Sequence, residues 1–152
     1  MALEYELNLP SDGSNMSWAF IGDLLIVFNS PGELTDKRLG ELIRAVSEYP
    51  VKLKYGIGAN IGRGQMTSVQ RKRSSEVFSG VRLVSIVDDR ITRGIVTALG
   101  WLGMNIKGFD WDHAKDAIEY LGIPGSDPDA LLKVVEELRD RGMERVKEGK
   151  QG

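Results

Sequence analysis

Residues 51–87 hold the feature that most constrains the fold, which is a strand, a helix and a second strand in close succession. Residues 51–59 are mostly apolar or alternating and end in a glycine cluster, a pattern that predicts a strand. Thr67 stands three residues before Gln70, a pairing that opens helices, and Ser79-Gly80 closes the helix. Residues 83–87 form another apolar run of strand length. The two strands should therefore be parallel neighbours joined by a right-handed crossover.

The segments on either side extend this unit into a larger sheet. Gly22-Asp23 between two apolar runs predicts a hairpin, Thr35 predicts the start of a helix, and Asp127-Pro128 predicts the start of the last helix. We expect an α/β fold with a single mixed, mostly parallel sheet in the order β-β-α-β-α-β-α-β-α, helices mainly on one face, and a C-terminal helix. The expected parts are an N-terminal arm or edge strand (1–14), an α/β domain (15–123) and a C-terminal helical extension (124–152).

Composition excludes several classes of protein. The chain has 152 residues with 41% hydrophobic and 28% charged residues, values typical of one globular domain. A net charge of −2 gives no general attraction to nucleic acid, and the absence of cysteine removes disulfides, thiol nucleophiles and cysteine metal sites. The longest apolar run, residues 24–28, is too short to span a bilayer, and the N-terminus lacks a secretory signal pattern. We therefore expect a cytoplasmic protein without a membrane span.

Three stretches give the chain a resemblance to a known family. They are Val-Ser-Ile-Val-Asp-Asp (84–89) leading into a helix, Asn-Ile-Lys-Gly-Phe-Asp (105–110), and Ala-Ile-Glu-Tyr-Leu-Gly (117–122). Together with the element order, they make residues 18–123 resemble the STAS domain, the anti-sigma-factor-antagonist fold, and its sporulation-antagonist-like relatives. The resemblance implies a bacterial-type regulatory or signalling module that binds a partner protein, is sometimes switched by phosphorylation, and sometimes binds nucleotides or lipids. The family's phosphoacceptor is a serine at a helix start, where this chain has Thr67 and Ser68.

Glycines between the first crossover strand and its helix suggest a second kind of site. Gly56, Gly58, Gly62 and Gly64 could turn their N–H groups toward an anion, with Arg63 adding charge, or they could simply permit sharp turns. The spacing also approximates a dinucleotide fingerprint. The basic run at residues 71–73 points in three directions on a helix, so it is either solvated or in reach of a phosphate or an acidic partner.

Acidic and aromatic residues follow the strands and leave further alternatives open. Asp88, Asp89, Asp110 and Asp112 should gather at the carboxyl edge of the sheet, either as helix caps or as a magnesium or acid–base site. The lone His113 is a poor metal ligand.

The hydrophobic pattern of the last helices leaves two alternatives, burial within the domain or contact with a partner protein. A buried stripe is predicted on the helix that follows residue 90, comprising Ile91, Ile95, Ala98, Leu99 and Leu102. Trp101 falls off that stripe and is either closed over by the C-terminal helix or exposed as an anchor for a partner, and Trp111 has the same two readings. The C-terminal helix either packs on its own domain through residues 131–138 or contacts a second chain.

The pattern as a whole favours a non-enzymatic regulatory or scaffolding module that works by binding a partner protein, with no catalytic residue, metal or cofactor. The alternative is a domain that binds a small ligand, a nucleotide or phosphate, through the glycine-rich loop 56–64. A homo-oligomer through the C-terminal helix or Trp101 is possible, and nucleic acid is not an expected partner. Partner or ligand contacts are predicted at Asn60, Gly62, Arg63, Gly64, Gln65, Arg71, Asp88, Asp89, Arg93, Asp110 and Trp111, with Thr67 and Ser68 as possible phosphoacceptors.

Overall fold

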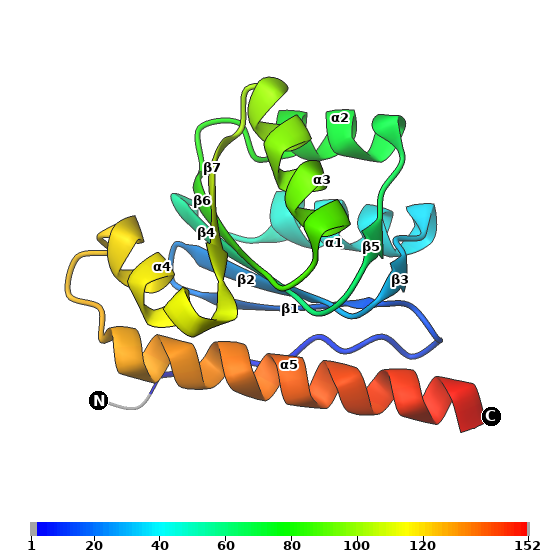
Figure 1. Ribbon diagram of the computed structural model, residues 1–152. Helices are drawn as coiled ribbons and strands as arrows, with labels where there is room; N and C mark the ends of the chain where they lie inside the picture. The colour runs from blue at the N-terminus through cyan, green and yellow to red at the C-terminus, as the bar shows by residue number, and fades with distance from the viewer. Residues whose placement is uncertain (1–2, 152) are drawn as a thin grey trace.

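A five-stranded mixed sheet forms the centre of the protein (Figure 1). The computed structural model describes residues 3–151, with side chains through residue 147. Strands β1 (Met16–Ile21) and β2 (Leu24–Asn29) form the predicted antiparallel hairpin, while β2, β4 (Tyr55–Asn60), β6 (Arg82–Val87) and β7 (Asn105–Asp110) run parallel in that order. The predicted fold class is confirmed.

The crossover unit that anchors the sequence prediction is present. Strands β4 and β6 are direct neighbours, with Ala59 opposite Ile86. Helix α2 (Ser68–Val77) joins them and begins with the reciprocal bonds expected from the sequence, since the Thr67 hydroxyl accepts from the Gln70 N–H and the Gln70 side chain accepts from the Thr67 N–H. The carboxyl ends of the parallel strands therefore meet at one edge of the sheet, as predicted.

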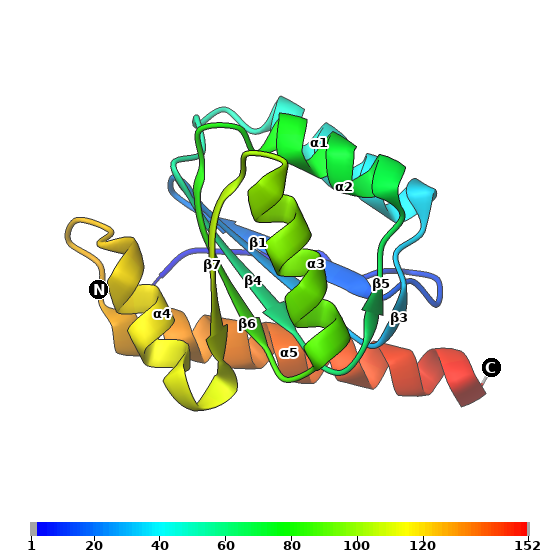
Figure 2. The ribbon, with the colours of Figure 1, turned by 45° about the horizontal axis from the view of Figure 1, so that its top comes forward.

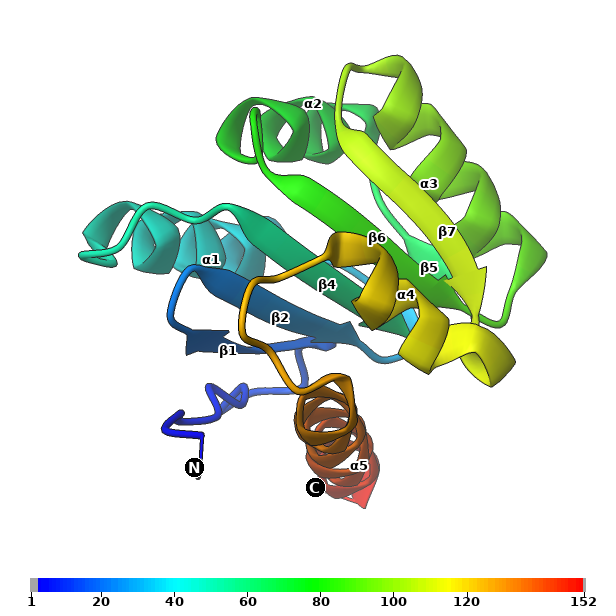
Figure 3. The ribbon, with the colours of Figure 1, turned by 90° about the vertical axis from the view of Figure 1, so that its left-hand side faces the viewer.

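The helices divide between the two faces of the sheet. Helices α1 (Asp36–Glu48), α2 and α3 (Arg90–Trp101) cover one face, and α4 (Ala114–Leu121) and α5 (Pro128–Gln151) cover the other. Figure 2 shows α5 crossing behind the strands, and Figure 3 views it almost end-on beside β1 and β2. This division is more even than the sequence predicts, because the helix expected as an extension supplies a buried apolar stripe to the second face.

Each face has its own hydrophobic core. Alternate strand residues such as Ile26, Ile57 and Ile86 pack against α4 and α5, where Leu138 of α5 is fully buried. The C-terminal helix thus packs on its own domain, which was one of the two predicted alternatives. On the other face, residues of α1 and α3 pack against the intervening strand residues.

Two short elements and one 3-10 turn complete the fold near the carboxyl edge. β3 (Gly32–Glu33) and β5 (Gly64–Gln65) pair in parallel beside the main sheet, and the turn at Trp111–His113 leads into α4. Within the described residues, no helix is long and apolar enough to cross a membrane.

The N-terminal segment lies along the domain as an arm, one of the two predicted possibilities. It contributes a single isolated bridge between Asn8 and Trp18. The buried Arg38 of α1 fixes this segment, because its guanidinium donates to the Asn8 side-chain oxygen (2.8 Å) and to the Met16 carbonyl (2.9 Å) and lies over the Trp18 ring. Removal from water lowers the pKa of Arg38.

The predicted buried stripe of α3 is right for Leu99 and for the partly buried Ile95, but it is wrong for Ile91 and Leu102. The residues that α3 buries are Thr92, Val96 and Leu99, whereas Ile91 and Leu102 are exposed. The cause lies at the start of the helix, where Asp89 caps the N-terminus and Thr92 turns inward to donate to the Gly62 carbonyl. Trp101 is 84% exposed, and α5 lies on the opposite face of the sheet, so the reading in which α5 closes over Trp101 is also wrong.

Candidate functional site

The glycine loop at the carboxyl edge of the sheet is filled by groups of its own chain. The Gly62 N–H donates to the Asp88 carboxylate at 2.7 Å, and the Gly64 N–H donates to the Thr92 hydroxyl at 3.0 Å. A carboxylate therefore occupies the place that a phosphate would take on this loop. Its negative charge disfavours a second anion at the same N–H group.

The other acidic residues of this edge also serve local structure. Asp89 accepts from the Ile91 and Thr92 N–H groups, which confirms the predicted cap. Asp110 makes no cap bond and instead pairs with Arg93. In the part of the chain that the structure describes, no group of three or more acidic or histidine side chains is placed to hold a metal ion.

Some of the remaining predicted contact residues form hydrogen bonds within the chain, and others have exposed side chains. Trp111 is half-buried, and its indole N–H donates to the Asn60 carbonyl at 2.8 Å. Arg71 donates to the Met66 carbonyl at 2.7 Å. The side chains of Arg63, Gln65 and Ser68 are exposed, and Thr67 holds the cap of α2. The strand ends therefore lie together as predicted. Most of the predicted contact residues, however, form hydrogen bonds that stabilise this edge of the sheet.

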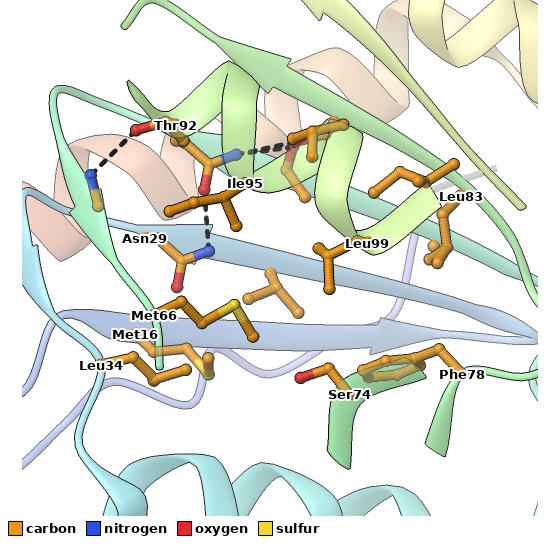
Figure 4. A pocket seen from close by; sticks show the side chains of 18 of the residues that line it. Met16, Asn29, Leu34, Met66, Ser74, Phe78, Leu83, Thr92, Ile95 and Leu99 are labelled. Carbon is orange, nitrogen blue, oxygen red and sulfur yellow. Dashed lines mark hydrogen bonds between the residues drawn. The ribbon is translucent and has the colours of Figure 1, made fainter. Parts of the chain in front are cut away.

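A cavity of about 160 Å³ lies behind this edge, between the sheet and helices α2 and α3 (Figure 4). Its floor is the face of β4 that carries Gly56, Gly58 and Asn60, while Ile57 and Ala59 point to the opposite core. Because strand residues alternate between faces, two glycines spaced two apart leave one face of the strand without side chains. The missing side chain of Gly58 opens the space, while the Leu83 side chain lies over Gly56.

Helix α2 forms the wall opposite the strands and lacks an apolar inner face. Its buried residues are Gln70 and Ser74. Gln70 donates to the Leu34 carbonyl at 2.7 Å and to Asp36 at 2.9 Å, which ties α2 to the start of α1. Helices usually anchor to a sheet through an apolar stripe. Helix α2 is instead attached by these hydrogen bonds near its start and by the packing of Val77 and Phe78 at its end, and it borders the cavity.

A chain of polar side chains crosses the cavity floor. The Asn29 amide donates to the Asn60 side-chain oxygen at 3.0 Å, and the Asn60 amide donates to the Ser85 hydroxyl and the Ile86 carbonyl, each at 3.1 Å. Figure 4 shows the free oxygen of Asn29 directed away from this bond, on the side of Met66. Within the described residues neither this oxygen nor the Ser74 hydroxyl has a hydrogen-bond partner.

Asn15 adds a buried acceptor to the same cavity. Its amide nitrogen donates to the carbonyls of Ser30 (3.0 Å) and Gly32 (3.3 Å), which fixes the orientation of the side chain. Its oxygen is buried and has no partner among the residues described. Buried polar atoms without a partner are rare in folded proteins, and each one calls for an explanation.

The rest of the lining is apolar and uncharged. Met16, Leu34, Met66, Ile95 and Leu99 surround the polar floor, as Figure 4 shows. Of the described residues that line the cavity, none is Asp, Glu, Lys, Arg or His. The site therefore combines apolar walls with a few fixed polar groups, the usual composition of a small-molecule site.

The polar cavity residues that no sequence pattern indicated are Asn15, Asn29, Ser74, Ser85 and Thr92. One signal was present: Gly56 and Gly58 alternate along the predicted strand 51–59, with Asn60 directly after it, and strand residues two apart share one face. The prediction of a glycine-rich loop at 56–64 treated these glycines as turn residues or as an anion site, but Gly56 and Gly58 lie inside strand β4.

No protein-family model matches this chain, and comparisons with curated proteins and with solved structures find no match. The resemblance to the STAS domain stays a prediction.

Proposed function

We propose that this protein is a non-enzymatic binding module that holds a small, largely apolar molecule between its sheet and helix α2. The observation that carries the proposal is the cavity of about 160 Å³ over Gly58. Protein interiors are close-packed, and the lining of an empty space loses its van der Waals contacts. A ligand in the cavity would restore those contacts, and its binding free energy would stabilise the fold.

Helix α2 is the wall that we expect to admit the ligand. Between its ends it buries Gln70 and Ser74 in place of an apolar stripe, so little hydrophobic free energy opposes displacement of its middle, while Val77 and Phe78 hold its C-terminal end in the core. Entry at this wall would leave the tightly packed α4–α5 face undisturbed.

The proposal is tested by filling the cavity from the strand. A Cβ built on Gly58 has only ordinary contacts, 3.8 Å to the Ser85 hydroxyl and 3.9 Å to the Val84 carbonyl, so Gly58→Val should fold and occupy the space. Gly108→Val is the matched control, because Gly108 is a glycine of strand β7, which β6 separates from β4, and it lies outside the cavity lining with its nearest contact at 3.8 Å.

Benzene and indole are titrated into each protein, and binding is followed by backbone amide chemical shifts. We expect saturable shifts in β4, α2 and α3 for the wild type and Gly108→Val, and their loss in Gly58→Val. Absence of binding to the wild type, or equal binding to a folded Gly58→Val variant, would overturn the proposal.

The partner-protein role predicted from the sequence is a second proposal, favoured by one observation. Trp101 is 84% exposed at the end of α3, next to Leu102 at 47%. Tryptophan is enriched among the residues that carry most of the energy of protein interfaces. Trp101→Ser should therefore abolish capture of a protein partner, while Val69→Ser, at another exposed apolar position, should not. Equal capture by both variants, measured against the wild type, would remove this role.

A further inference from the structure

We infer that the cavity takes a neutral molecule of about one ring that carries a hydrogen-bond donor such as a hydroxyl or an amide N–H. This inference rests on the proposed function and specifies the chemistry of its ligand.

The lining argues for an uncharged ligand. The cavity residues among those described include no acidic, basic or histidine side chain. A buried ion is expensive unless an opposite charge or several hydrogen bonds compensate it. At the nearby edge, Asp88 is engaged by the Gly62 N–H and Arg93 by Asp110, while Arg63 is exposed and does not line the cavity. A phosphate or carboxylate ligand would find no counter-ion in the cavity.

The free polar atoms argue for a donor on the ligand. The Asn15 oxygen is buried, lines the cavity and accepts no hydrogen bond within the described chain. The Asn29 amide nitrogen makes the bond to Asn60, and no donor among the described residues bonds to the Asn29 oxygen. Both amides are held in place by their N–H groups, so both oxygens are fixed acceptors. The Ser74 hydroxyl also lines the cavity, has no hydrogen-bond partner among the described residues, and can donate or accept.

The volume argues for a ligand of about one ring. An apolar cavity of about 150 Å³ is large enough for benzene, and this cavity measures about 160 Å³. Apolar walls such as Leu34, Ile95 and Leu99 suit the body of a ring, while the polar floor suits a single substituent.

The test compares benzene, phenol and benzoate at pH 7, three probes that share a ring and differ in its substituent. Dissociation constants are measured from amide chemical shifts of the full chain. Phenol should bind about tenfold more tightly than benzene, the ratio expected for one added hydrogen bond. Benzoate should not bind at concentrations that saturate the phenol site.

A variant locates the acceptor. Asn29→Leu removes one acceptor, while Asn60 keeps its bonds to Ser85 and Ile86. This variant should bind benzene as the wild type does and lose at least part of the preference for phenol. If Asn29→Leu does not fold, the affinities of the wild type for benzene, phenol and benzoate still test whether the ligand carries a donor and is neutral.

The outcomes separate this inference from the proposed function. Equal binding of benzene and phenol would overturn the inferred donor and leave a ligand-binding cavity. Tightest binding of benzoate would overturn the inferred neutrality in the same way. Binding of none of the three, with only water in the cavity, would overturn both.

Discussion

The two faces of the central sheet are built from the same strands but are packed in different ways. On the α4–α5 face, β4 contributes Ile57 and Ala59 to a continuous apolar core. On the α1–α3 face, the same strand contributes Gly56, Gly58 and Asn60 and borders a cavity. Alternation along a strand therefore lets one element stabilise the fold on one side and form a candidate site on the other.

The largest expected effect comes from truncating the packed face. Leu138 of α5 is fully buried against the sheet, so Leu138→Ala should lower the free energy of unfolding by about 2–5 kcal/mol. Leu99→Ala on the cavity wall should cost less, because part of the Leu99 surface already faces empty space. Urea denaturation of both variants measures the difference. Equal losses would mean that the two faces are packed alike.

A smaller loss is expected from adding volume to the packed face. A Cβ on Gly142 of α5 would lie 2.6 Å from Cδ2 of Phe28, so Gly142→Val should destabilise by about 1–3 kcal/mol as α5 is pushed from the strands. Gly94→Val on α3 is the matched control, since no atom lies within 4 Å of its added Cβ. Thermal unfolding in which the two variants behave identically would contradict the close approach of α5.

On the cavity face, the same kind of addition should be tolerated. The Cβ of Gly58→Ala meets only atoms at 3.8 Å and beyond, and the variant has fewer unfolded conformations, so we expect a gain of about 0.4–1 kcal/mol. Gly56→Ala provides the contrast, because its Cβ would lie 2.3 Å from Cδ2 of Leu83 and that side chain must move. If Gly58→Ala proved the more destabilising of the two in urea, the cavity would not be where the structure places it.

Local signals in the sequence were sufficient for the fold but not for the site. The capping pair Thr67 and Gln70, the hairpin at Gly22-Asp23 and the alternating strands each depend on neighbours in the chain, and each is confirmed. The carboxyl edge followed from topology alone, since parallel strands end together.

The cavity depends on contacts between distant segments, which no local pattern reports. Asn15, Asn29 and Ser74 come from a loop, a strand and a helix, and each has a polar side chain that suits an exposed position equally well. The rotation of α3 was missed for a related reason. Hydrophobicity favoured an inward Ile91, but the bond from Thr92 to the Gly62 carbonyl, about thirty residues away in sequence, decides which face turns inward.

The smallest predicted effect is a pH dependence confined to the α5 face. The Tyr5 hydroxyl of the N-terminal arm donates to Glu137 of α5 at 2.5 Å. This hydrogen bond, together with burial and the negative charge of Glu137, raises the pKa of Tyr5 above 10.0. A raised pKa means that the fold favours the protonated phenol, so the stabilisation is complete below pH 10 and is lost as the pH rises through the folded-state pKa. The urea midpoint of the wild type should therefore fall further between pH 9 and pH 11 than that of Tyr5→Phe, which has no phenol to ionise.

Phenol-binding measurements at pH 7 provide the control, because the cavity lies on the other face and Tyr5→Phe should leave its affinity unchanged. Parallel pH profiles of the two proteins would show that the arm is not held to α5 by this bond.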